Sequence, residues 1–271
     1  MNDVITDRTS RGRSVGLVPF LFGLAGSPTL PGVGLRRLLG DLGVSDDAAR
    51  ALLARLTRAG QLVSERHGRT VDYRLAGDLA RGFERIRSSD QSGPVEWPGS
   101  FAAVMYQVPE EHRAFRDAMR RAAVLAGYGV LQPGVLISMS ELGDRLDGVL
   151  AERPGSARVW PARLALSVED AAEAASIAWD LPGLARSYRS HLTRLDATDA
   201  VPDDPGEALR AYAETVMPVL VETLREPRLP APLMPADWPG TELRAAVGRF
   251  SGAVMPRVHP YVAELAGGVH R

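Results

Sequence analysis

The sequence predicts an α+β protein in successive parts, and three features of its pattern support this prediction. The first 78 residues hold helical stretches followed by a hairpin signal, residues 97–166 alternate between strand and helix, and the chain from 167 onward is helical. Each assignment rests on the spacing of apolar residues, which differs between helix and strand. We therefore expect one domain over 1–78, a linker helix and linker over 79–96, an α/β domain over 97–166 and a helical domain over 167–271.

The composition is that of a folded chain with a basic amino-terminal part. Hydrophobic residues make up 45% of the 271 residues, and the net charge is −1. All 32 basic residues are Arg; residues 1–90 carry 14 Arg against 10 acids, whereas residues 91–271 carry 18 Arg against 23 acids. A polyanionic partner is therefore expected at the amino-terminal end. The sequence lacks Cys, which excludes disulfides and thiolate sites, and we expect a cytoplasmic protein that does not cross a membrane.

Glycine and proline separate the first two predicted helices. Ser14 to Leu24 has helical periodicity, and the turn-rich run Gly26 to Gly32 follows it. Leu35 to Leu42 is predicted as a second, short helix that Gly43 ends. The short turn after it sets the angle at which the next helix leaves.

The third predicted helix bears most of the candidate functional residues. Ser45 is a natural cap at its start, and Gly60 ends it. One face is apolar, formed by Ala49, Leu52, Leu53 and Leu56. Arg50 and Arg58 point away from that face, where they either contact DNA or form an ordinary solvated surface.

Two acids in the first turn of this helix have more than one interpretation. Asp46 and Asp47 lie where the helix dipole favours negative charge, although carboxylates at this end also repel phosphates. They could alternatively accept a hydrogen bond from a cytosine amino group. From sequence, we favour the dipole role.

A hairpin with arginines at its tip completes the first domain. Two extended runs, Gln61–Arg66 and Thr70–Leu75, are joined through His67-Gly68 and place Arg66 and Arg69 at the tip. Three helices followed by such a hairpin is the order of a winged helix-turn-helix. An α-helix fits the DNA major groove, while a hairpin tip reaches phosphates or the minor groove. The sequence therefore predicts that double-stranded DNA is contacted by Ser45, Arg50, Arg58, Arg66 and Arg69.

The rest of the chain predicts a ferredoxin-like α/β domain and then helices. The predicted order in the middle is strand, helix, two strands, helix and strand. The first strand covers 100–107, the first helix 110–125, the third strand 135–138, the second helix 141–150 and the last strand 157–164, and the second strand is a short extended piece between Gly129 and Gln132. From Val168 the pattern is helical, with a break at Trp179-Asp-Leu-Pro182. Further helices are expected from Glu207 to Glu226, with Pro218 inside, and from Thr241.

The pattern of an enzyme active site is missing from the sequence. The 5 His are scattered without a zinc-type helical pair, and the sequence has no Lys and no Gly-x-Ser-x-Gly segment. We therefore expect no catalytic residues, no metal ligands and no cofactor. The alternative is a small-molecule or thioester-binding enzyme or carrier whose winged helix serves only as a protein-interaction module.

Segments along the chain also match a known family. They are Gly68-Arg69 with Tyr73-Arg74-Leu75, Gly127 to Ser138, Trp179-Asp-Leu with Tyr188, and Leu229 to Pro239. Together they resemble the PaaX-type repressors of phenylacetic acid catabolism, in order from about Ser14 to Leu265.

The resemblance implies a cytoplasmic, homodimeric bacterial transcription regulator whose winged helix binds a palindromic operator. It further implies release from DNA by an effector, an aryl-acyl-CoA such as phenylacetyl-CoA. Trp179 and Tyr188 are the candidate effector contacts, with anchoring of the hydrophobic core as the alternative role.

Overall fold

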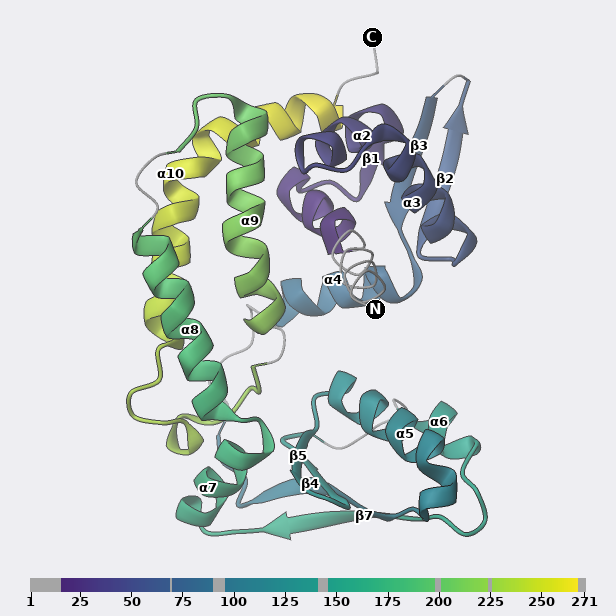
Figure 1. The fold of residues 1–271 in the computed structure, drawn as a ribbon, viewed down its shortest axis with the longest axis vertical. Coiled ribbons are helices and arrows are strands. Elements are labelled where there is room, and N and C mark those ends of the chain that lie inside the picture. Colours follow the sequence, from purple (N-terminus) through teal and green to yellow (C-terminus); the bar gives the residue numbers. More distant parts are fainter. Residues whose placement is uncertain are drawn as a thin grey trace, which may run out of the picture. The chain divides into compact units, whose positions relative to one another are not determined.

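The computed structural model describes residues 16–68, 70–89, 96–140, 146–197, 201–223 and 226–267. Contacts divide the chain into two compact units. The first comprises Met1–Ser92, Arg194–Pro218 and Arg244–Arg271, and the second comprises Gly93–Thr193 and Val219–Leu243. Helices accompany two antiparallel sheets, which confirms the α+β class (Figure 1). The domain boundaries expected along the chain stay a prediction.

The first unit joins helices to a three-stranded antiparallel sheet of order β1-β3-β2. Residues 16–25 are helical, and the elements that follow are β1 (Thr29–Pro31), α2 (Gly32–Asp41), α3 (Asp46–Arg58), β2 (Leu62–His67), β3 (Thr70–Leu75) and α4 (Gly77–Ser89). Tyr73 of β3 lies opposite Leu30 of β1 and Ser64 of β2. The chain returns to this unit through the first part of α9 (Pro205–Thr223) and most of α10 (Gly240–Gly267).

Strand β1 and the start of α2 differ from the sequence prediction. The turn-rich run before the second helix contains this three-residue strand, and α2 begins at Gly32 rather than Leu35. Pro31 is tolerated because β1 is an edge strand of the sheet. A Cβ atom at Gly32 would lie 2.9 Å from the backbone oxygen of Val71, so glycine allows the close approach of α2 to β3. A three-residue strand that contains proline leaves no alternation to detect.

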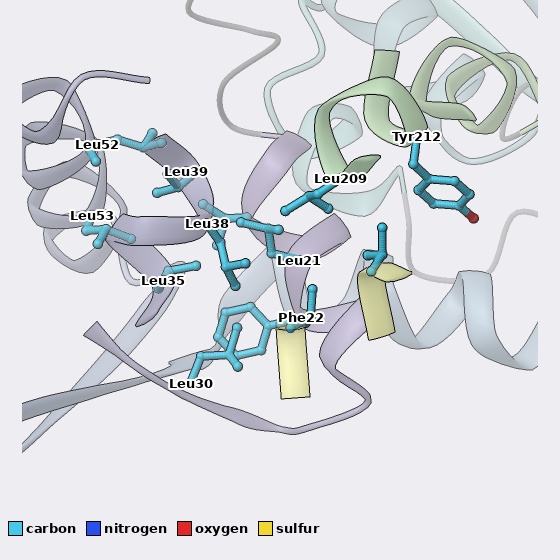
Figure 2. Close-up of a cluster of buried hydrophobic side chains, with 14 of the residues drawn as sticks. Leu21, Phe22, Leu30, Leu35, Leu38, Leu39, Leu52, Leu53, Leu209 and Tyr212 are labelled. Carbon is cyan, nitrogen blue, oxygen red and sulfur yellow. The ribbon is translucent and has the colours of Figure 1, made fainter. Parts of the chain in front are cut away.

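The core of the first unit forms between its helices (Figure 2). The apolar face predicted for α3 is buried, and it packs with leucines of α2, including Leu35 and Leu38. Leu209 of α9 and Val258 and Val262 of α10 complete the same cluster. Burial of each such side chain contributes roughly 1.5–3 kcal/mol. The carboxy-terminal helices are therefore part of the core beneath α2 and α3.

A polar contact fixes α10 against the end of α2. The Tyr261 hydroxyl donates to Asp41 Oδ2 at 2.5 Å, and Arg37 Nε donates to the Tyr261 oxygen at 3.3 Å. Arg210 of α9 donates to the backbone oxygen of Asp41 at 2.7 Å. These bonds hold α2 at the carboxy-terminal end from which the turn to α3 departs.

The second unit contains a four-stranded antiparallel sheet of order β5-β6-β4-β7. Its elements are β4 (Ser100–Gln107), α5 (Arg113–Leu125), β5 (Gly129–Gln132), β6 (Val135–Ser138), α6 (Asp147–Ala151), β7 (Arg158–Ala165), α7 (Val168–Ala178) and α8 (Leu181–Asp196), the last three residues of which belong to the first unit. Alternate residues of β4 face opposite sides. Phe101 and Ala103 pack in the cluster with α7, whereas Val104 and Tyr106 pack with Met119 of α5.

The break between α7 and α8 occurs where the sequence predicts it. Asp180 has a positive φ of 45°, and its Oδ1 accepts a hydrogen bond from the backbone nitrogen of Gly183 at 3.1 Å. The side chain thus caps the start of α8, as aspartate does at many helix starts. Helix α9 continues through Pro218.

Candidate nucleic-acid interface

Helix α3 presents one uncovered face, because its other face is fixed against α2 and β2. Ser45 caps the helix as predicted, with its Oγ accepting from the backbone nitrogen of Ala48 at 3.4 Å. The preceding turn has a positive φ of 84° at Gly43, which permits the abrupt change of direction after α2. The cap and the glycine together define where α3 begins and how it leaves α2.

The exposed face of α3 has an acid at one end, small residues in the middle and a base at the other end. Residues opposite the buried stripe, at helical spacing, are Asp47, Ala51, Ala54 and Arg58, and all are exposed. Arg50 and Arg55 lie beside this row and are also exposed. We call Asp47, Ala51, Ala54 and Arg58 the α3 row. Sequence reasoning did not single out Ala51 or Arg55, although their place opposite the apolar stripe is the signal that finds them.

Arg50 is bound to acids of its own helix. Its Nη2 lies 2.7 Å from Asp46 Oδ2 and 3.0 Å from Asp47 Oδ1. The hydrogen bond that Arg50 donates to Asp47 and the negative charge of Asp46 raise the pKa of Arg50, so the guanidinium remains charged. Arg36 of α2 reaches the same cluster, with its Nη1 3.2 Å from Asp46 Oδ1. A DNA contact by Arg50 therefore requires that it exchange or share these carboxylates.

Arg58 lies at the opposite end of the α3 row. Its Nε donates to the backbone oxygen of Ala54 at 3.3 Å, so the side chain folds back along the helix. The side chain is exposed. Within the described residues Arg58 forms no ion pair, so its guanidinium can reach a phosphate without breaking one.

The strands β2 and β3 of the hairpin extend beyond the adjacent helix α3 (Figure 1). Arg66 is exposed, and its Nε donates to the backbone oxygen of Gly68 at 3.2 Å. Gly68 has a positive φ of 62°, as the tight connection requires. Arg69 lies outside the described residues. Acids also occur on the hairpin: Glu65 lies 3.9 Å from Arg74 and 4.0 Å from His67.

The candidate effector residues contact different neighbours in the second unit. Trp179 packs against Phe101, with ring centroids 6.1 Å apart, in the cluster between the sheet and α7. Tyr188 is fully buried on α8, donates its hydroxyl to Glu226 Oε2 at 2.8 Å and packs against Trp238. Nothing in these contacts brings Trp179 and Tyr188 together.

Sequence reasoning missed a polar network near Tyr188. Glu222 accepts from Ser187 at 2.6 Å and lies 3.1 Å from His191 Nε2. Trp238 Nε1 donates to Glu226 at 3.1 Å. The partners come from α8 and from residues 222–238, so only the folded arrangement reveals the network.

Among the residues that the structure describes, no group of three His, Asp or Glu side chains could hold a metal ion. A helix long and apolar enough to cross a bilayer is not found in those residues either.

Three family models match successive parts of the chain. The PaaX-like protein family model matches residues 21–79, the PaaX protein central Cas2-like domain matches 94–175, and the PaaX-like protein C-terminal domain matches 179–264. No curated protein matches the chain. Among solved structures, the uncharacterized protein Rv0674 from Mycobacterium tuberculosis is 26% identical with a TM-score of 0.57, over 85% of this chain and 90% of that one.

Proposed function

The chain belongs to the PaaX family, and from this premise we propose that it is a transcriptional repressor that binds double-stranded operator DNA. The observation that carries the proposal is the uncovered face of α3, which follows a tight turn and carries the exposed Arg50 and Arg58. A helix held in this way can enter the major groove with its first residues toward base edges.

We further propose that the first unit is a winged helix-turn-helix and that the sheet of the second unit is ferredoxin-like. Support for the first comes from helical residues 16–25, α2 and α3, followed by an antiparallel hairpin that pairs with β1. Support for the second comes from the order strand, helix, two strands, helix and strand, and from the sheet order β5-β6-β4-β7.

The proposed contacts divide by role. Arg50 would meet base edges at the start of α3, and Arg58 would meet phosphate at its end. Ser45 would donate its hydroxyl to phosphate while its oxygen caps the helix. Arg66 and Arg69 would hold the backbone or minor groove from the hairpin. A homodimer would place two copies of α3 in half-sites separated by about 34–36 Å, one helical turn, or a multiple of it.

The proposed effector is an aryl-acyl-CoA such as phenylacetyl-CoA, bound by the second unit near Trp179 or Tyr188. Binding there would favour a conformation with low affinity for the operator. An effector can shift this equilibrium only by its difference in affinity between the two states.

The test is fluorescence anisotropy of the full chain with a labelled duplex from upstream of its own operon. A scrambled duplex of equal length, at the same salt concentration, is the control, because phosphate contacts alone bind any sequence. We expect the operator to bind roughly a thousand-fold more tightly and phenylacetyl-CoA to release it. Equal affinity for both duplexes would contradict the proposed function.

A further inference from the structure

The two acids at the start of α3 have different surroundings. Asp46 is bonded to Arg36 of α2 and to Arg50, and its side chain is 55% exposed. Asp47 has Arg50 as its one partner within the described residues, and its side chain is 95% exposed. Asp46 therefore links α2 to α3, whereas Asp47 projects into solvent at the first position of the α3 row.

The position of Asp47 is unfavourable for general DNA binding. A carboxylate at the leading end of a groove-facing helix repels phosphates and reduces affinity for every duplex alike. Asp46, at the same end of the helix, already interacts with the helix dipole and forms an ion pair with Arg50. The second acid, on the solvent-facing row, is therefore free to meet a partner outside the protein.

The Asp47–Arg50 pair matches the major-groove edge of a G·C base pair. That edge presents N7 and O6 of guanine as acceptors beside the N4 amino donor of cytosine. Arg50 Nη2 and Asp47 Oδ1 lie 3.0 Å apart, about the separation of cytosine N4 and guanine O6, which are hydrogen-bonded to each other. The carboxylate can accept from N4 while the guanidinium donates to O6 and N7. The pair with Asp47 then stays intact, and the bond from Arg50 Nη2 to Asp46 is exchanged for the bond to guanine.

An A·T pair fits this arrangement less well. Its N6 amino donor has an acceptor on each side, N7 of adenine and O4 of thymine. The guanidinium then has no two adjacent acceptors on one base and loses its bidentate contact. The Asp47–Arg50 pair therefore makes one charge-assisted hydrogen bond fewer with an A·T pair than with a G·C pair.

The middle of the α3 row permits the approach that this contact needs. Ala51 and Ala54 follow Asp47 on the same face and present only methyl groups. No long side chain of the row stands between Asp47 and Arg58 to hold the helix away from the bases.

We propose that Asp47 and Arg50 act as an ion pair that recognises one C·G base pair in each half-site, with Asp47 accepting from cytosine N4. The inference rests on the proposed function, because it presupposes that α3 enters the major groove. It assigns different roles to the two acids: Asp46 positions α3, and Asp47 determines specificity.

The experiment selects binding sites from a random duplex pool with the full chain and with Asp47→Asn, Asp47→Ala and Asp46→Asn. Asparagine pairs with adenine N6 and N7, so Asp47→Asn should change the preferred base at one symmetric position from C to A. Asp47→Ala should reduce the preference there by roughly ten-fold in relative affinity, because the contact to cytosine N4 is lost while Arg50 can still donate to the paired guanine. Asp46→Asn removes the same charge one residue away. Because Asp46 holds Arg36 and Arg50, this variant should lower affinity for every site while keeping the same preferred base at that position.

Several outcomes separate the two proposals. If the unaltered chain selects no sequence, the proposed function fails. If it selects an operator and both Asp47 variants select the same one with the same discrimination at every position, the function stands and this inference is overturned. A change in the preferred base at one position, seen only with the Asp47 variants, supports the inference. Thermal unfolding of each variant confirms that the fold is kept, as the exposure of Asp47 leads us to expect.

Discussion

Arg50 shows how the state of a single residue bears on DNA binding. Its guanidinium is held by two carboxylates of the same helix, yet all three side chains are more than half exposed. Exposed ion pairs contribute little net free energy, so exchanging one carboxylate for a base or phosphate costs little. Arg58 has no such pair among the described contacts and folds onto the helix backbone.

Loss of Arg50 and loss of Arg58 should therefore affect DNA binding differently. Arg50→Ala should weaken operator binding by about 1–3 kcal/mol and reduce discrimination against other sequences. Arg58→Ala should weaken binding to all duplexes alike. It should also lower the slope of log affinity against log salt concentration by the amount of about one phosphate contact. Anisotropy titrations over a range of salt concentrations measure both.

The matched control is Arg120→Ala, which removes an exposed arginine from α5 of the second unit. Its operator affinity should stay close to that of the unaltered chain. If the Arg50 variant is no weaker than this control, α3 does not contact DNA through Arg50.

Tyr261 makes the stability of the first unit depend on pH in the alkaline range. Burial, followed by the hydrogen bond to Asp41, raises the pKa of this phenol above its ordinary value. A raised pKa means that the neutral phenol contributes stability below the ordinary tyrosine pKa of about 10 and that this contribution is lost as pH rises through the folded-state pKa. Tyr261→Phe should cost about 1 kcal/mol at neutral pH.

Chemical unfolding of the unaltered chain and Tyr261→Phe, from neutral pH to above the ordinary tyrosine pKa, tests this. The difference in unfolding free energy should shrink as pH rises. A difference that stays constant over the whole range would rule out ionisation of Tyr261 as its source.

At the scale of the elements, caps and glycines could be predicted, whereas contacts between elements could not. Ser45 and the Trp179-Asp180 break are local signals, and the structure places both where the sequence predicts. Strand β1 was missed because its three residues pair only with distant β3. The bond of Arg36 to Asp46 was missed for the same reason, since it depends on how the turn at Gly43 orients two helices.

Helix α2 contains a pair of glycines that tests the packing of α10. A Cβ atom at Gly34 would collide with the backbone oxygen of Leu265, whereas one at Gly40 would meet no atom within 4 Å. Gly34→Ala should therefore destabilise the first unit by about 1–3 kcal/mol. Gly40→Ala, on the same helix, should stabilise it by up to about 1 kcal/mol through helix propensity.

Urea unfolding midpoints of the two variants provide the measurement. Equal effects of the two substitutions would show that α10 does not pack closely on α2. The contrast also separates packing from helix propensity, because the two substitutions change the same residue type in the same helix.

For the whole molecule, the sequence does not predict that the carboxy-terminal helices join the first unit. Periodicity predicted helices near 207–226 and from 241, but not that Leu209 and Val258 would enter the core beneath α2. Helix α9 contributes Leu209 to the first unit and Glu222 to the polar network of the second. Residues of one helix in the sequence are thus divided between the two units.

The proposed effector response is a property of the whole molecule and follows thermodynamic reciprocity. If phenylacetyl-CoA lowers operator affinity by some factor, operator DNA must lower phenylacetyl-CoA affinity by the same factor, typically about 5- to 150-fold. Calorimetric titration of the thioester into the free chain and into the chain saturated with operator measures the change in thioester affinity. Anisotropy with and without thioester measures the change in operator affinity. Coenzyme A and phenylacetate, tested separately, should each produce a smaller factor, because each lacks part of the ligand. Unchanged operator affinity at saturating phenylacetyl-CoA would exclude this thioester as the effector and leave DNA binding by α3 standing, since the two rest on different units of the chain.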